Sequence, residues 1–172
     1  MSADSGGVTA TRYVGARIPR IEDGRLLTGR SSYVDDIVLP RMLHARFVRS
    51  TFARAAIRSI DTSAALAIPG VRFVFTAADV NAGAQAQWHT SIGPHGPETP
   101  RPPLAEGEVR FVGDPVALVV ADSLAIAHDA AELVEIDYDP LPVVVDYRTA
   151  ADADALVHEA HGSNVAAEMS GL

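Results

Sequence analysis

The chain has 172 residues, a mass of 18.1 kDa and a hydrophobic fraction of 48%, which is enough for one folded domain with a sizeable core. It contains no cysteine, and all 14 basic residues are arginine, so disulfides, thiolate or lysine nucleophiles and iron–sulfur ligation are excluded. The net charge is −8, with ten arginines against five acidic residues in residues 1–60 and four against seventeen in residues 61–172. The acidic main body argues against nucleic acid as a partner. The basic N-terminal third meets an acidic partner or folds onto the acidic remainder, and the second interpretation is favoured.

Residues 1–42 show little of the hydrophobic periodicity that predicts helices or strands. Residues 1–12 are small and polar, lack the apolar core of a secretory signal and predict a flexible N-terminal tail. No apolar run approaches the ~18 residues of a membrane span, so we expect a cytoplasmic protein without such a span. Residues 12–42 carry turn residues throughout and predict a loop-rich segment with a short helix over 20–27.

The next segments have the periodicities of strands and short helices. Strands are predicted over 43–49, 55–61 and 71–75. In the first of them, Leu43, Ala45 and Phe47 form the apolar face of a half-buried strand. A short helix begins near Asp61, where three good N-cap residues follow one another, and ends at Pro69. One more helical turn is predicted over 76–80.

Residues 81–108 form a long Pro/Gly-rich loop. Nine glycines and prolines in this stretch rule out a sustained helix or a central strand. A loop of this length in a compact domain is either disordered or placed against something. It carries Trp88, the only tryptophan, and aromatic anchors mark interfaces. We therefore regard this loop, together with the basic segment 12–58, as the best candidate for a contact surface.

Two apolar runs, 109–112 and 116–121, are predicted strands on either side of Gly113. A dinucleotide fingerprint needs three glycines that lead straight into a helix. Here a single glycine is followed by Asp114-Pro115 and a second strand, so Gly113 predicts a turn or bulge rather than a phosphate site.

The C-terminal third begins with a predicted helix over 123–134. Its apolar stripe, at spacings of three and four, consists of Leu124, Ala127, Ala131 and Val134. A strand over 134–139 follows, with Val134, Ile136 and Tyr138 facing inward. Residues 150–172 are predicted to be a linker or C-terminal tail with a short helix over 152–158.

Clustered carboxylates do not indicate a site. Glu135, Asp137 and Asp139 would share one strand face at separations of about 6.5–7 Å. A straight strand does not make them converge as calcium requires. Asp35 and Asp36 are adjacent residues at a strand end and point apart, so they do not form a shared-proton dyad.

The histidines and serines give equally weak evidence for a functional site. His89, His95 and Glu98 could form a two-histidine, one-carboxylate metal site, but nothing rigid holds them. His158 and His161 lie in the predicted tail and are expected to face solvent. There is no G-x-S-x-G motif. The residues alone therefore predict an acidic α+β domain with no catalytic, cofactor-binding or metal-binding residue.

Four segments of the sequence, in a fixed order, are informative when taken together. They are YVGARIPRIEDGRLLTGRSSYVDDIVLPRMLHARFVRS from Tyr13, IRSIDTSAALAIPGVRFVFTAADV from Ile57, LAEGEVRFVGDPVALVVAD from Leu104 and AHDAAELVEIDYDPLPVVVD from Ala127. They resemble the opening of the molybdenum-binding large subunit of the xanthine dehydrogenase, aldehyde oxidase and carbon monoxide dehydrogenase family. One departure is Thr51-Phe52, where the family often has proline and then histidine or tyrosine, and this leaves the subfamily open.

The resemblance implies an α/β-hammerhead domain over residues 13–149, with mixed strands, two main short helices and the long Pro/Gly-rich loop. In that family the molybdopterin-contacting segments and the catalytic glutamate lie far downstream, so no position here inherits a role. The chain would be an excised domain, a truncated product or a split subunit of a molybdenum hydroxylase. Its partners would be the catalytic domains of the same large subunit and the iron–sulfur and flavin subunits. The alternatives are a stand-alone non-catalytic binding module that reuses the fold and a small metal enzyme using His89, His95 and Glu98.

Overall fold

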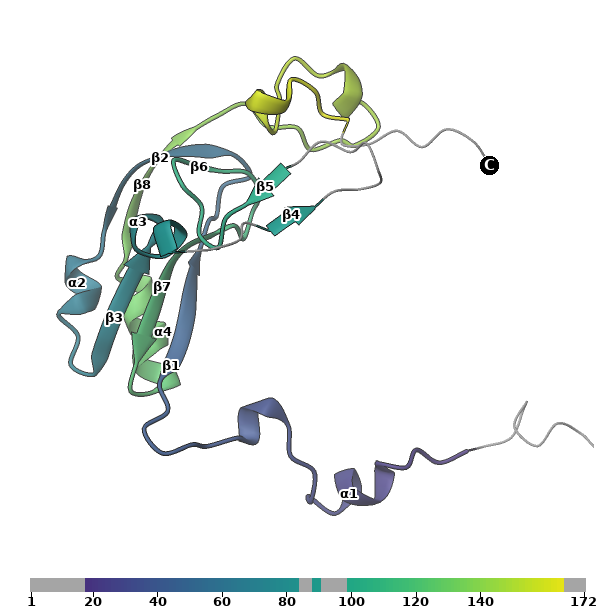
Figure 1. Cartoon of the computed structure of the whole chain (residues 1–172), viewed down its shortest axis with the longest axis vertical. Coiled ribbons are helices and arrows are strands. Elements are labelled where there is room, and N and C mark those ends of the chain that lie inside the picture. The colour runs from purple at the N-terminus through teal and green to yellow at the C-terminus, as the bar shows by residue number, and fades with distance from the viewer. Residues whose placement is uncertain (1–17, 84–87, 91–98, 166–172) are drawn as a thin grey trace, which may run out of the picture. The chain divides into compact units, whose positions relative to one another are not determined.

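The computed structural model describes residues 18–83, 88–90 and 99–165, and the chain divides into two compact units between Arg41 and Met42. Figure 1 labels the α-helices and strands of both units. No helix within the described ranges is long and apolar enough to cross a membrane.

The first unit contains helix α1 (Asp23–Leu27) and the short 3-10 helix η1 (Val34–Asp36). A side-chain oxygen of Asp23 accepts a hydrogen bond from the Arg20 backbone N–H at 3.1 Å, and Asp36 accepts one from Tyr33 N–H at 2.8 Å. The Asp36 carboxylate thereby satisfies a backbone group at the start of η1, and that of Asp23 closes the turn before α1. No described residue of this unit is buried, so its described part has no core of its own.

The second unit is built on an antiparallel sheet of β1 (His44–Arg49), β7 (Pro115–Ala121) and β3 (Val71–Thr76). Figure 1 shows the three strands side by side, with β7 in the centre. The sequence of β7 is apolar at every position, which suits a central strand with two apolar faces.

A second antiparallel sheet consists of β6 (Glu108–Val109), β2 (Ala55–Asp61) and β8 (Glu135–Pro140), with β2 in the centre. The backbone of β4 (Trp88–Thr90) pairs with that of β5 (Thr99–Arg101) as a separate two-stranded ribbon. The Pro/Gly-rich segment therefore contributes short peripheral strands and no central one.

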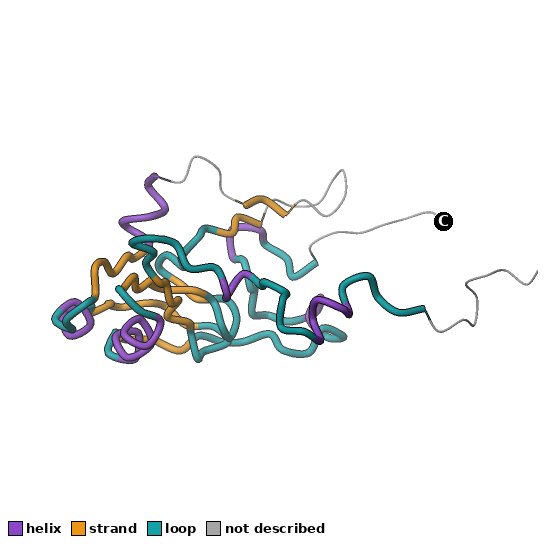
Figure 2. The backbone as a smooth tube through the Cα atoms, turned by 90° about the horizontal axis from the view of Figure 1, so that it is seen from below, coloured by secondary structure: helices purple, strands orange, loops and turns teal. Residues whose placement is uncertain are grey.

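The core lies between the first sheet and two helices, α2 (Ser63–Leu66) and α4 (Leu124–Glu132). These helices contact each other and pack on the same side of the sheet (Figure 2). The buried residues of this core are Ala65, Ala117, Val119, Ala130 and Val134. A second cluster, under the other sheet, consists of Ala55, Ala105, Val109 and Val116. Ile60 and Ile136 pack against both clusters, so the two sheets share one apolar interior.

Local turn chemistry fixes the path of the chain around α4. Ser123 caps the helix, because its hydroxyl accepts a hydrogen bond from Ile126 N–H at 3.2 Å. Gly70 joins α2 to β3 with φ of +94°, and a Cβ there would lie 2.8 Å from the Cδ1 atom of Ile126. Both the backbone conformation and the close approach of α4 therefore require glycine. Two further elements, α3 (Ala77–Val80) and the 3-10 helix η2 (Asn81–Gly83), follow β3.

The apolar face of β1 is directed opposite to the sequence expectation. Ala45 and Phe47 are exposed, and the residue of β1 that packs against the buried core is Val48. The reason is that the small side chains Ala117 and Val119 of β7 let the helices approach the other face of the sheet. The strand is half-buried as predicted, but its larger apolar side chains point away from the helices.

Two smaller expectations also differ from the structure. The strand predicted over 109–112 ends at Val109, because residues 110–114 form a turn. On α4 the buried positions are Ala127 and Ala130, whereas Leu124 at the first helical position is exposed. A first-turn side chain of a helix is easily left beyond the edge of the sheet.

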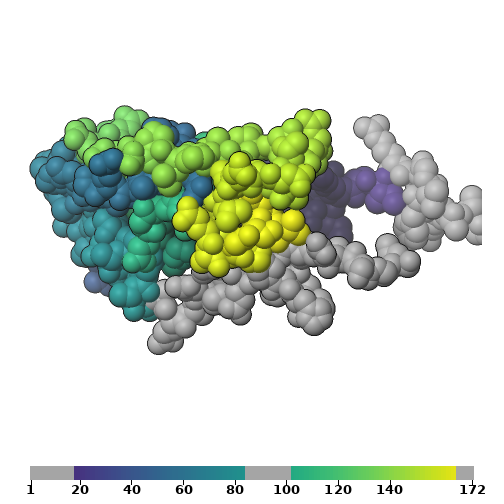
Figure 3. Space-filling view, turned by 90° about the horizontal axis from the view of Figure 1, so that it is seen from above, coloured from purple at the N-terminus to yellow at the C-terminus, as the bar shows by residue number. Residues whose placement is uncertain are grey.

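The helix predicted over 152–158 is absent, and two 3-10 turns take its place, η3 (Ala150–Asp152) and η4 (Glu159–His161). The Asn164 side chain donates to the carbonyls of Ala150 and Ala155 at 2.9 and 2.7 Å and accepts from Val157 N–H at 2.9 Å. These bonds satisfy the local backbone without a helix. In Figure 3 this segment, in yellow, lies against the body of the second unit.

Candidate docking surface

The side of the β1–β7–β3 sheet that faces away from α2 and α4 is covered at one end, where Val116 of β7 is buried in the second cluster, and is open beyond it among the described residues. Strand register places Phe47 and Phe75 beside Leu118, and Ala45 and Phe73 beside Val120. Directly opposed residues of antiparallel strands project from the same face. We call this set the apolar sheet face: Ala45, Phe47, Phe73, Phe75, Leu118 and Val120.

The exposure of its aromatic residues shows that this face is open. Phe47 is 42% exposed and Phe73 is 51% exposed, and the Phe73 ring stacks on Phe75 with centroids 5.5 Å apart. Leu118 and Val120 are half-buried between them. A contiguous exposed apolar patch of this kind marks an interaction site in soluble proteins.

Charge is distributed unevenly around the sheet. None of the six residues of the apolar sheet face is charged, whereas α4 on the other side carries exposed Asp129 and Glu132, and β8 of the second sheet carries exposed Glu135 and Asp137. An interface core is depleted of charge relative to the rest of the surface. The apolar sheet face has this composition, and the helix side has that of a solvated surface.

One rim of the apolar sheet face is formed by a hydrogen-bonded turn over residues 110–114. Gly113 N–H donates to the Ser50 carbonyl at 2.8 Å, and Ser50 N–H donates to the Asp114 carbonyl at 2.9 Å. Asp114 also accepts from Arg110 N–H at 3.0 Å through its side chain. The turn predicted at Gly113 is therefore present, with φ of +94°, and it exposes Phe111 and Val112.

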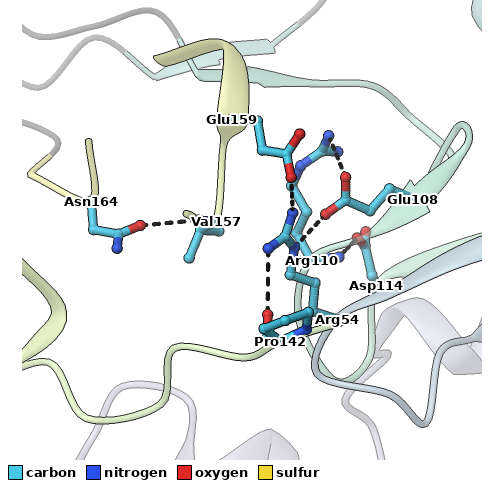
Figure 4. Close-up of polar contacts among 8 residues, drawn as sticks. All are labelled: Arg54, Glu108, Arg110, Asp114, Pro142, Val157, Glu159 and Asn164. Atoms are coloured by element: carbon cyan, nitrogen blue, oxygen red, sulfur yellow. Dashed lines mark hydrogen bonds and ion pairs between the residues drawn. The ribbon is translucent and has the colours of Figure 1, made fainter. Parts of the chain in front are cut away.

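Behind this turn lies a charged cluster centred on Arg54, whose side chain is only 6% exposed (Figure 4). Its Nε donates to Glu108 at 2.6 Å, its Nη2 to Glu159 at 3.0 Å and its Nη1 to the Pro142 carbonyl at 3.4 Å. The hydrogen bond to Glu108 raises the pKa of Arg54, burial opposes this rise, and Glu159 adds to it. The cluster joins β2 to β6 and to the C-terminal segment, which is a structural role.

A cavity of about 500 Å³ opens beside this cluster. It is lined by Pro102, Ala105, Arg110, Phe111, Asp114, Pro115, Val157 and His158. The Arg110 Nε atom is buried without a hydrogen-bond partner among the described residues. Arg110 also lies 3.5 Å from Glu108 through Nη2. The Arg110 side chain offers a hydrogen-bond donor to a ligand with an acceptor group. Among the described residues, the lining holds no nucleophile that is hydrogen-bonded to a general base.

The structure does not bring the sequence-predicted candidates together. Asp36 serves its own backbone turn in η1, rather than ending a strand. Asp139 forms an ion pair with Arg58 at 2.7 Å, while Glu135 and Asp137 remain exposed on β8. These carboxylates act as surface charges.

The histidine candidates fall partly outside the described residues. His95 and Glu98 lie there, and only the backbone of His89 is described, in β4, so the metal site they would form stays a hypothesis. His158 and His161 are half-buried rather than solvent-facing, because the C-terminal segment packs on the domain. The side chain of Trp88, also in β4, is not among the described features, and its contact role remains a prediction.

A molybdenum cofactor would need a set of side chains suited to its metal. Across 18–83 and the other described ranges, no three histidine or carboxylate side chains gather as metal ligands would, and the chain has no cysteine. The described residues thus offer no set of side-chain ligands that would suit the metal of a molybdenum cofactor. The expectation that this chain carries no catalytic or cofactor-binding residue remains a prediction.

Sequence reasoning missed two features of this region. Arg54 gave no pattern, because its partners Glu108 and Glu159 are 54 and 105 residues away. The apolar sheet face had a signal in the unbroken apolar run of β7, since such a strand needs cover on both faces.

The sheet, its two helices and the attached second sheet form an α/β-hammerhead. Residues 28–142 match the family described as "Aldehyde oxidase and xanthine dehydrogenase, a/b hammerhead domain". The chain belongs to this family, which confirms both the fold and the resemblance seen in the sequence. It is a domain of the kind found in molybdenum hydroxylase large subunits.

Individual relatives agree with this assignment. The chain is 46% identical over 155 residues to the nicotine 6-hydroxylase large subunit of Paenarthrobacter nicotinovorans, covering 88% of this chain and 19% of that protein. It is 46% identical over 142 residues to the carbon monoxide dehydrogenase large chain of Afipia carboxidovorans, covering 83% and 17%. The crystal structure of quinoline 2-oxidoreductase from Pseudomonas putida 86 aligns with a TM-score of 0.81 and 44% identity, covering 89% and 20%. The chain thus spans less than a fifth of the length of these two curated relatives.

Proposed function

We propose that this hammerhead domain is a non-catalytic packing and docking element of a molybdenum hydroxylase. Its apolar sheet face would bind the remaining polypeptide of the large subunit. The observation that carries the proposal is the open part of this face, with Phe47 and Phe73 exposed on the two strands that flank β7. A domain that worked alone in water would gain stability by covering or charging such a face.

The length of the relatives supports this choice of occupant. They are about five times longer than the matched segment, so in each of them a hammerhead is accompanied by several hundred further residues. Obligate interfaces within such subunits resemble a divided hydrophobic core. The apolar composition of the face supports this partner rather than an acidic or basic one; the charge beside it, on Arg49 over the Phe47 ring, is already bonded to the Gly113 carbonyl.

The cofactor and the electron-transfer partners belong to the same proposal. In the complete enzyme a molybdopterin-type cofactor would supply the oxidation chemistry, and iron–sulfur and flavin subunits would receive the electrons. This chain would contribute shape and contact area to that assembly, in the cytoplasm. No step of the reaction is assigned to its residues.

A chimera tests the docking role. In the large subunit of the nicotine 6-hydroxylase relative, the 155-residue matching segment is replaced by this chain. The Phe47→Ser and Phe73→Ser variants are compared with Leu124→Ser, which changes an apolar residue of comparable exposure, 52%, on the helix side. We expect soluble, assembled subunit from the parent chimera and from Leu124→Ser, and loss of assembly from the two sheet-face variants.

Folding of the variants is checked separately. The same substitutions in the 172-residue chain alone are followed by circular dichroism and thermal unfolding, where partly exposed positions cause small changes. Variants that fold alone but fail to assemble support the proposal. A chimera that assembles equally well with serine in place of Phe47 and Phe73 contradicts it, and favours a stand-alone binding module.

A further inference from the structure

The described part of the first unit, residues 18–41, is a segment without a core, here called the arm. Its four most exposed large apolar side chains, Ile21, Leu27, Val34 and Val38, are between 81% and 95% exposed. No residue of the arm is buried. Fixing a chain into helical turns costs conformational entropy that burial must offset, and the arm has no burial of its own to offset it.

Part of the backbone of the arm is nevertheless hydrogen-bonded from within. Asp23 and Asp36 accept hydrogen bonds from backbone N–H groups at the start of each turn, and the Thr28 hydroxyl donates to the Gly24 carbonyl at 2.7 Å. The backbone groups that are bonded in this way can enter an apolar contact at little desolvation cost.

The charges of the arm cancel. It has four arginines and four carboxylates, which are Arg20, Arg25, Arg30, Arg41, Glu22, Asp23, Asp35 and Asp36. The surplus of positive charge in residues 1–60 is therefore carried outside the arm. A neutral arm with exposed apolar side chains fits an uncharged apolar surface and gains nothing from an acidic one.

We propose that the arm is a second docking element, which binds an uncharged apolar surface of the remaining large-subunit polypeptide, and that this contact is insensitive to salt. The inference rests on the proposed function for the identity of the partner. It adds a contact that the apolar sheet face does not supply. Because the arm is tethered to a docking domain, even a weak contact would be occupied through its high effective concentration.

Trypsin provides the test, because the arm contains exposed cleavage sites at Arg20, Arg25 and Arg30. Cleavage in the 172-residue chain is compared with cleavage in the chimeric large subunit described above. We expect cleavage at these sites to slow by about tenfold or more in the chimera, since protease attack follows the population of the open state. Protection should persist at about 1 M salt, where ionic contacts are screened.

Two sets of substitutions separate apolar from ionic contacts. The combined Ile21→Ser, Leu27→Ser and Val38→Ser variant should be cut in the chimera at nearly the rate of the isolated chain. The matched control, Glu22→Ser with Asp35→Ser, removes charge from the arm and should retain the protection. Thermal unfolding of the isolated chain should be the same for both variants and the parent, because none of these residues belongs to a core.

The possible outcomes are distinct. Rapid cleavage in an assembled chimera, or protection that salt abolishes, overturns the inference and leaves the proposed function intact. Protection already present in the isolated chain means that the arm covers its own chain, and protection that grows with concentration means a second copy; either result also overturns it. A chimera that fails to assemble removes the proposed function and this inference together.

Discussion

The guanidinium carbon of Arg49 lies 5.4 Å from the centre of the Phe47 ring, and Nη1 of the same side chain donates to the Gly113 carbonyl at 2.9 Å. Arg49 thus connects the apolar sheet face to the turn at its rim. The Arg49→Met substitution removes a cation–π contact and a charge-assisted hydrogen bond, and should cost about 1 kcal/mol of unfolding free energy. Urea unfolding measures this, with Arg46→Met on the same strand as the control; equal costs would contradict the role.

The Arg54 cluster should respond asymmetrically to substitution. Arg54→Met leaves Glu108 without its closest partner in a mostly buried position and should destabilise the domain by about 3 kcal/mol. Glu159→Gln removes a carboxylate that is 78% exposed and should cost less than about 1 kcal/mol. Denaturant midpoints give both values. Similar losses for the two variants would show that the C-terminal contact matters more than the buried pair.

Gly70 and Gly113 form a matched pair, because both have φ of +94°. An alanine at either position takes the left-handed penalty of about 1–2 kcal/mol. Only at Gly70 would the new Cβ also meet the Ile126 side chain, which should add about 1 kcal/mol. The difference between the two alanine variants in urea unfolding isolates this contact, and a second substitution, Ile126→Val, should reduce it.

Asp79 makes part of the stability depend on pH. Hydrogen bonds from the Thr76 backbone N–H and, secondly, from its hydroxyl lower the pKa of this carboxyl below its ordinary value. A lowered folded-state pKa gives stability that is present above about pH 4 and lost as the pH falls through the folded value. Asp79→Asn should therefore flatten the acid limb of the stability curve. Urea unfolding at a series of acidic pH values measures this, and an unchanged acid limb in the variant would contradict the role of Asp79.

The Tyr138 hydroxyl is buried, and no hydrogen bond of sound geometry reaches it from the described residues. Burial raises the pKa of this phenol, and the nearby Ser50 lowers it in part. The Ser50 hydroxyl, however, is already hydrogen-bonded to the backbone of Phe52, with both distances 3.0 Å. Tyr138→Phe should consequently leave stability unchanged or raise it by up to about 1 kcal/mol. A loss of more than about 1 kcal/mol in urea unfolding would mean that Ser50 does serve this hydroxyl.

Much of the fold follows from local patterns in the sequence. The strand 55–61 has the predicted bounds, and α4 begins after its capping residue Ser123. Helix α2 begins at Ser63, whose backbone N–H donates to the Asp61 side chain. These features depend on residues within a few positions of each other, which a periodicity or a cap reports directly.

The candidate surface depended on information that is not local. The alternation of β1 separated its two faces, but it could not say which one the helices would cover. The covered face is determined by β7, some seventy residues later in the chain. Ala117 and Val119 of β7 let α4 pack on one side of the sheet, and Phe47 lies beside Leu118 on the other side. The partner of Arg54 and the side-chain bonds of Asn164 are likewise set by the packed structure.

The position of β7 in the chain also governs how the domain can be made. Its two neighbours, β1 and β3, are synthesised first, and neither can pair until residues 115–121 have left the ribosome. Pairing between segments so distant in sequence is slow, and the unpaired edges stay open meanwhile. The nascent chain therefore passes through a vulnerable interval that closes with its central strand, and a chaperone that shields Phe47 and Phe73 during translation would protect the yield of the folded domain.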